Sequence, residues 1–116
     1  MSDIKNAIEN LNEMVLQGQM LDAFEKYYAD DVVMHEGTER FAGKDLNHER
    51  EKAFFGSITE FRGAEVKGVT IGDDVTMVEW HFDYTHAEWG DMKYDQVAVQ
   101  RWRNGEIVDE RFYKAT

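Results

Sequence analysis

Two acidic residues follow or lie within apolar strand-like segments, where a carboxyl group could do acid/base chemistry. Glu36 follows the apolar residues 32–34 and precedes Gly37, so its side chain can point into the mouth of a cavity. Glu110 lies in the last predicted strand, with the parity opposite to Asp109 and Arg111. A bulge near the preceding turn would exchange the two faces, so both orientations remain open. If both glutamates face inward, they form an acid/base pair, and otherwise they are surface charges.

A second polar group, Glu79, His81 and Asp83, has a spacing that could hold a metal ion. These residues alternate with the apolar series of the clearest strand, which comprises Val78, Trp80, Phe82 and Tyr84. Because side chains alternate between the faces of a strand, the apolar series faces the helices and the polar series faces outward. We therefore predict a solvated or homodimer-forming outer face, on which Arg101 and Arg103 pair with the carboxylates, and no metal site.

The aromatic residues predict an apolar wall around a ligand pocket. The expected lining comprises Phe54, Trp80, Phe82, Tyr84, Tyr94 and Phe112, with Asn12 and Gln96 as hydrogen-bonding groups. His86 shares the parity of the apolar face, which predicts a place at the pocket rim. The expected ligand is a small apolar or partly polar molecule.

Composition limits the other functional classes. The 116 residues have a formal net charge of −11, 42% hydrophobic residues and no cysteine. The negative charge argues against nucleic acid and anionic membranes, and the missing thiols exclude disulfides. No signal peptide, membrane-spanning segment, phosphate-binding glycine loop, nucleophile elbow or HExxH motif is found. We expect a cytoplasmic protein that requires no cofactor.

Helical periodicity comes first in the chain and strand periodicity follows. Three helices are expected, and the first runs from Ser2 or Asp3 to Gly18. The second has Leu21, Phe24 and Tyr28 on one stripe and ends at Asp30-Asp31, and the third runs from about Asp45 to about Ser57. The inward-facing residues of the third are expected to be Leu46, Ala53, Phe54 and Ile58, and its middle, residues 48–52, is expected to face solvent. Strands are expected over residues 32–34, 61–71, 75–86, 92–102 and 107–113. This order predicts one α+β domain over residues 1–116, in which helices cover one face of a curved, mainly antiparallel sheet.

Three segments resemble known parts of one superfamily. Ala23 to Met34 resembles the second helix and first strand of NTF2-like proteins. Phe61 to Val66 and Trp102 to Val108 resemble the second strand and the final hairpin of the SnoaL-like branch. The resemblance implies an NTF2-like cone, also described as a cystatin-like α+β barrel, that often forms homodimers through the outer sheet face.

The resemblance also implies where chemistry would occur. It aligns Glu36 with the catalytic acid of ketosteroid isomerase-like members, and it aligns Asn12 and Ala98 with their two oxyanion donors. Because Ala98 cannot donate a hydrogen bond, steroid isomerisation is disfavoured. Acid/base isomerisation, cyclisation or hydration with Glu36 as base is the expected reaction class. A non-catalytic binding or homodimerisation module is the alternative, and the sequence leaves open whether a reaction occurs.

Overall fold

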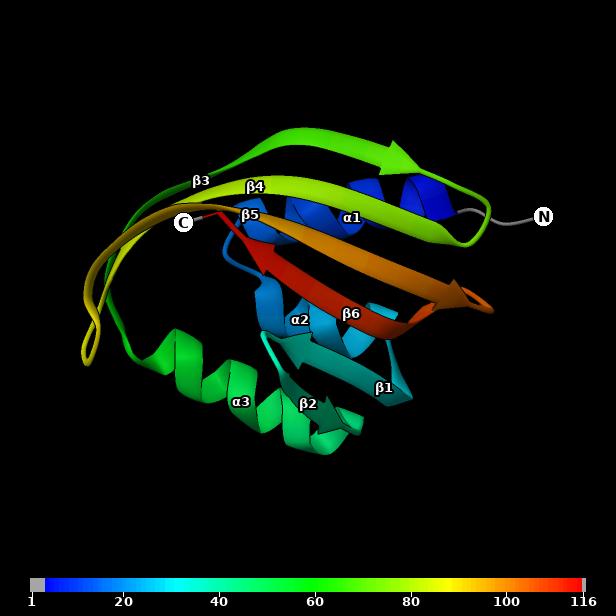
Figure 1. The fold of residues 1–116 in the computed structure, drawn as a ribbon, viewed down its shortest axis with the longest axis horizontal. Coiled ribbons are helices and arrows are strands. Elements are labelled where there is room, and N and C mark those ends of the chain that lie inside the picture. Colours follow the sequence, from blue (N-terminus) through cyan, green and yellow to red (C-terminus); the bar gives the residue numbers. More distant parts are fainter. Residues whose placement is uncertain (1–3, 116) are drawn as a thin grey trace.

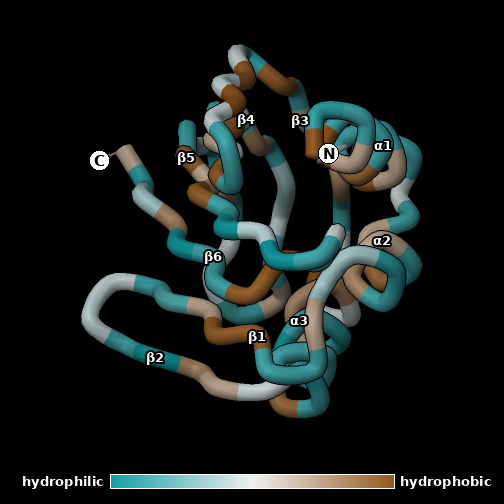
Figure 2. Tube along the Cα trace, turned by 90° about the vertical axis from the view of Figure 1, so that its right-hand side faces the viewer, coloured by the Kyte–Doolittle hydropathy of each residue, from teal (hydrophilic) through white to brown (hydrophobic). Residues whose placement is uncertain are grey.

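Three helices cover one face of a six-stranded sheet in the computed structural model, which describes residues 4–115. The helices are α1 (Ile4–Leu16), α2 (Met20–Tyr27) and α3 (Lys44–Gly56). The expected cap residues of the first helix, Ser2 and Asp3, lie outside the described residues. Figure 2 shows the helices gathered on one side of the sheet. None of the helices in the described residues is long and apolar enough to cross a membrane.

The sheet has the strand order β2-β1-β6-β5-β4-β3. Its strands are β1 (Tyr28–Glu36), β2 (Glu39–Ala42), β3 (Ile58–Ile71), β4 (Val75–His86), β5 (Gly90–Arg103) and β6 (Glu106–Lys114). Only β1 and β6 pair in parallel, and the other neighbours are antiparallel. The sheet is strongly curled but not closed, and its long strands arch over the helices (Figure 1). The predicted α+β cone is thus confirmed.

Strand β4 sets the two faces of the sheet. Val78, Trp80 and Tyr84 are buried on the inner face, as the alternation predicts. On the outer face, His81 contacts Asp95 at 2.7 Å and Asp83 accepts a 2.7 Å hydrogen bond from Arg62.

The outer-face pairs differ from the predicted ones because the strand register separates the expected partners. Arg101 lies opposite Val75, so it is not a cross-strand neighbour of the acidic residues. Arg103 instead reaches Asp31 at 3.0 Å. The prediction of those two arginines as partners was therefore wrong.

The hairpin between β5 and β6 decides which face Glu110 occupies. Asn104 and Gly105 both have positive φ angles, 53° and 81°, as a tight two-residue turn requires. The register shifts between Arg101 and Trp102 on the way into this turn. The result places Glu110 inside, 2% exposed, while Asp109 contacts His35 at 3.0 Å on the other face.

Four local features differ from the sequence predictions. The second helix ends at Tyr27, so Tyr28 begins β1 and does not extend the helical stripe. The short strand β2 was not predicted, and β3 begins at Ile58, before the predicted start. Leu46, expected to face inward, is 49% exposed, because α3 turns a different side toward the sheet.

Candidate functional site

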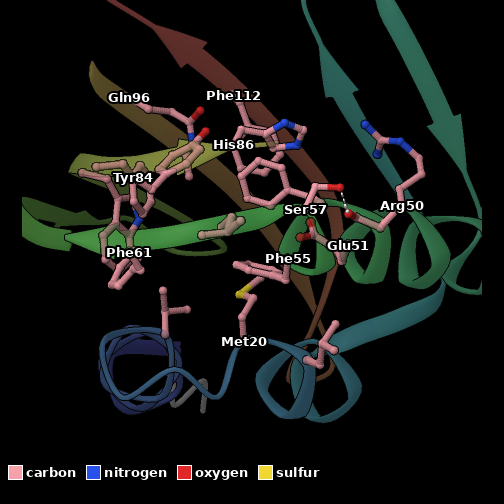
Figure 3. A pocket seen from close by; sticks show the side chains of 18 of the residues that line it. Met20, Arg50, Glu51, Phe55, Ser57, Phe61, Tyr84, His86, Gln96 and Phe112 are labelled. Carbon is pink, nitrogen blue, oxygen red and sulfur yellow. Dashed lines mark hydrogen bonds between the residues drawn. The ribbon is translucent and has the colours of Figure 1, made fainter. Parts of the chain in front are cut away.

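A cavity of about 970 Å³ lies between the inner face of the sheet and the helices. Figure 3 shows residues from both the helices and the sheet around it, among them Met20 from α2, Glu51 from α3 and Gln96 from β5. The lining includes these predicted site residues: Glu36, Phe54, Trp80, Phe82, Tyr84, Tyr94, Gln96, Glu110 and Phe112. Asn12 is buried in α1 but is not part of the lining, and its Oδ1 has no hydrogen-bond partner.

Glu110 is held in one orientation by two hydrogen bonds on the cavity wall. The Tyr28 hydroxyl donates to Oε1 at 2.6 Å, and the Gln100 amide donates to Oε2 at 2.9 Å. Burial raises the pKa of Glu110 to about 7, although both hydrogen bonds favour the carboxylate and lower it. The carboxyl group can therefore exist in either protonation state near neutral pH.

A chain of buried polar groups fixes Gln100 behind this carboxyl group. The Thr76 hydroxyl donates to the Gln100 side-chain oxygen at 2.7 Å, and the Trp102 indole donates to that hydroxyl at 2.9 Å. Because the Gln100 oxygen is an acceptor in this chain, its amide nitrogen must face Glu110. The chain thus fixes the direction of the hydrogen bond to the acid.

Glu51 brings a second carboxyl group to the same cavity from α3. Burial raises its pKa to about 8, the charge of Glu110 raises it further, and Arg50 lowers it. Residues 48–52 were expected to face solvent, which is wrong for both Arg50 and Glu51 because both line the cavity. Asn47, Glu51 and Phe54 are spaced to lie on one helix face, which could have indicated that this face is turned inward. The pattern was missed because two of the three residues are polar.

Glu36 lies at the end of β1, where its half-exposed carboxylate forms an ion pair with Arg50. Arg50 also donates to Asn47 Oδ1 at 2.9 Å and lies 3.4 Å from the centroid of the Phe41 ring. Asn47, in turn, donates to the carbonyls of Phe41 and Gly43 and so anchors the start of α3. The charge of Glu36 is thus compensated by a neighbour, whereas Glu110 has only neutral hydrogen-bond partners.

The sheet also contributes hydroxyl groups among the aromatic rings of the cavity wall. The hydroxyls of Tyr84 and Tyr94 are hydrogen bonded at 2.7 Å, and burial raises the pKa of both. Gln96 lines the cavity beside them, and Ala98 is buried on the same strand. In the described residues no group of three or more potential ligands is arranged to hold a metal ion.

The sequence and the fold match a known family. The SnoaL-like domain profile matches residues 8–110, and the chain therefore belongs to the SnoaL-like family. No curated protein matches the chain.

Solved structures agree with this assignment. A protein from Mesorhizobium loti, described as a candidate SnoaL-like polyketide cyclase, has 29% identity and a TM-score of 0.87, over 97% of this chain and 99% of that one. An NTF2-like protein of unknown function from Burkholderia pseudomallei has 16% identity and a TM-score of 0.82, over 99% and 92%. A candidate isomerase from Bacillus subtilis has 20% identity and a TM-score of 0.79, over 99% and 90%.

Proposed function

We propose that this protein binds a small, mainly apolar molecule in the cavity and catalyses acid/base chemistry on it without a cofactor, with Glu110 as the proton-transferring group. The observation that carries this proposal is the buried Glu110 carboxyl group, held by Tyr28 and Gln100 on the wall of an aromatic cavity. Its pKa of about 7 suits both removal and return of a proton near neutral pH. The names of the similar proteins, a cyclase and an isomerase, agree with this reaction class.

The proposed step begins at a carbon next to a carbonyl group. Glu110 takes a proton from that carbon, and the electron pair moves onto the carbonyl oxygen to form an enolate. Return of the proton at a second carbon would give isomerisation. Attack of the enolate carbon on another carbonyl carbon of the same molecule, followed by return of the proton to the resulting alkoxide oxygen, would give cyclisation. Tyr84, Tyr94 and Gln96 are among the lining groups that can donate a hydrogen bond to an oxygen of the substrate.

Glu36 takes a different role in this proposal from the one expected from the sequence. Its carboxylate is partly exposed and paired with Arg50, so the pair forms a polar part of the cavity wall. Because the negative charge of this carboxylate is already balanced by Arg50, protonation stabilises it less, and it is a weaker base. Replacing each glutamate by glutamine in turn therefore shows whether Glu110 or Glu36 is the base.

The test is deuterium exchange at a carbon acid. The methyl protons of 2-acetylnaphthalene in D₂O are followed by NMR with the wild-type protein and with Glu110→Gln and Glu36→Gln. Catalysed exchange should fall about 100-fold or more in Glu110→Gln, as expected for loss of a general base, and change little in Glu36→Gln. The reverse pattern would return the catalytic role to Glu36. No exchange with this ketone and other carbon acids would favour a non-catalytic binding module.

We also propose that a second copy of the chain packs on the outer face of the sheet. An apolar patch spans β4, β5 and β6 on that face and consists of Met77, Val97, Val99 and Tyr113, of which Met77 and Tyr113 are exposed. A lysine at the centre of such a contact would be buried without a partner charge. Met77→Lys should therefore shift the species seen by native mass spectrometry from dimer to monomer. Leu16→Lys, at an exposed apolar position on α1, is the control.

A further inference from the structure

His86 ends β4 and is 4% exposed, yet neither hydrogen-bond chain of the site includes it. Its ring stacks on that of Trp89 with centroids 3.8 Å apart, and it lies 5.9 Å from the ring of Phe54. Its Nδ1 accepts hydrogen bonds from the backbone N–H groups of Glu88 and Trp89, at 3.1 and 3.4 Å. The turn after β4 therefore fixes both the position and the rotation of the ring.

These two hydrogen bonds determine which nitrogen carries the proton. Because Nδ1 accepts, the single proton of the neutral ring resides on Nε2, which lies on the far side of the ring from the turn. Nε2 has no hydrogen-bond partner within residues 4–115. Within residues 4–115, the side-chain polar atom that is both fully buried and without a hydrogen-bond partner is Asn12 Oδ1. Since Nε2 of His86 also has no partner, it is not fully buried.

His86 forms part of the cavity lining (Figure 3). Because Nδ1 is bound to the turn, Nε2 is the ring nitrogen left for a molecule in the cavity. Near neutral pH Glu110 is partly ionised, and Glu36 already holds Arg50 in an ion pair, so an anionic group in the cavity would be repelled by Glu110 without gaining a free Arg50. A neutral oxygen, as in a ketone, accepts a hydrogen bond without that repulsion. The apolar remainder of such a molecule fits the aromatic wall.

We propose that His86 is a positioning residue, which binds the carbonyl oxygen of an uncharged ligand through its Nε2–H group. This inference rests on the proposed small-molecule function of the cavity. It adds an oriented donor at the end of β4, whose ring is held by the turn that follows. The ligand class is an uncharged ketone or related carbonyl compound with an apolar body.

The first test concerns the ring itself and needs no ligand. Two-dimensional ¹H–¹⁵N correlation spectra that report histidine tautomers are recorded on the wild-type protein at neutral pH. The expected result is a neutral His86 with a protonated Nε2 and an unprotonated Nδ1. A ring protonated on Nδ1 would overturn the proposal, because the fixed donor would then not exist.

The second test uses two variants that separate the two sides of the ring. His86→Asn keeps an acceptor at the position of Nδ1 and removes the donor that reaches the cavity. His86→Gln keeps a donor near the position of Nε2 and removes the acceptor for the turn. A merely structural His86 would be replaced better by asparagine, and a ligand-binding His86 better by glutamine.

The probes are 2-acetylnaphthalene and 2-isopropenylnaphthalene, which have the same shape but differ in the carbonyl oxygen. Affinities are measured by NMR titration of the wild type and both variants. The wild type should bind the ketone about tenfold more tightly, a difference that matches one buried hydrogen bond. His86→Asn should abolish this preference, and His86→Gln should retain part of it.

The outcomes distinguish this inference from the proposed function. If both probes bind the wild type equally, or if His86→Asn keeps the preference, the role of His86 is overturned and the cavity remains a ligand site. If neither probe binds, the small-molecule function of the cavity fails and the inference fails with it. Preference for the ketone without catalysed exchange would support His86 and reject Glu110 as a base.

Discussion

The Tyr28 hydroxyl donates a 2.6 Å hydrogen bond to Glu110, although the two residues are 82 positions apart in the sequence. Tyr28 is the first residue of β1, and Glu110 lies on β6, which runs parallel beside it. The parallel pairing thus creates the buried acid of the candidate site. Four predictions follow from this arrangement and from the buried polar groups around it.

The stability of the protein should fall as the pH rises through neutrality. Glu110 ionises near 4.5 in an unfolded chain and near 7 in the folded one, so between these values the folded state binds more protons. The free energy of unfolding should therefore decrease by about 3 kcal/mol from Glu110 between pH 4.5 and 7. Glu51, with a pKa of about 8, extends the decrease to higher pH.

Urea denaturation at pH 5 and pH 8 checks this prediction. The decrease should be smaller in Glu110→Gln, because glutamine cannot ionise in either state. Glu9→Gln, at an exposed position of α1, should show the wild-type decrease. An unchanged pH dependence in Glu110→Gln would mean that Glu110 does not hold its proton through this pH range.

Tyr28→Phe should raise the pKa of Glu110. The tyrosine hydroxyl stabilises the ionised carboxyl group, so its removal favours the protonated form. The titration can be followed by ¹³C NMR of labelled glutamate side chains. Tyr27→Phe is a matched control, because that hydroxyl accepts a hydrogen bond from Asn10 and does not bond to the acid. Equal titrations in the two variants would contradict the assigned role of Tyr28.

Thr76→Val should destabilise the protein by about 2 kcal/mol, measured by urea denaturation. The change keeps the side-chain shape but leaves the Gln100 oxygen and the Trp102 indole without their partner. Thr70→Val, at an exposed position of β3, should change stability by less than about 0.5 kcal/mol. A similar small effect at Thr76 would show that the chain does not hold Gln100 in place.

Asn47→Asp should destabilise the protein by about 3 kcal/mol, because it replaces a buried donor with an acceptor beside two carbonyl oxygens. Amide hydrogen exchange should also become faster in the first turns of α3, since this residue anchors its start. Asn6→Asp, exposed on α1, is the control. Wild-type exchange rates in α3 would disprove the anchoring role.

The sheet could be predicted well because its signal is local. The bounds of β4, Val75–His86, are those expected from strict alternation between apolar and polar residues. The same alternation correctly separated the cavity wall, which includes Trp80 and Tyr84, from the outer residues Glu79 and His81. Strand β2 was missed because its four residues are mostly exposed and show no such pattern.

The acids of the site could be predicted only in part, because their environment depends on distant residues. The facing of Glu110 depends on the turn at Asn104–Gly105 and on the register shift before it, which parity alone left open. Glu51 looked like a solvated helix residue because its neighbours in sequence are charged. Its environment is set by the docking of α3 against the sheet. Helical periodicity could not predict which side of α3 docks, because the inward-facing residues are themselves polar.

The pairing of β1 with β6 also has a consequence for how the protein folds. The wall that holds the acid joins residues near the start of the described chain to residues near its end, so it requires a contact of very long sequence separation. Such contacts close late and slow folding. During synthesis, β1 emerges well before β6, so the two strands cannot pair until nearly the whole chain is present. A chain shortened before Glu106 would lack Glu110 and Phe112 of the cavity wall.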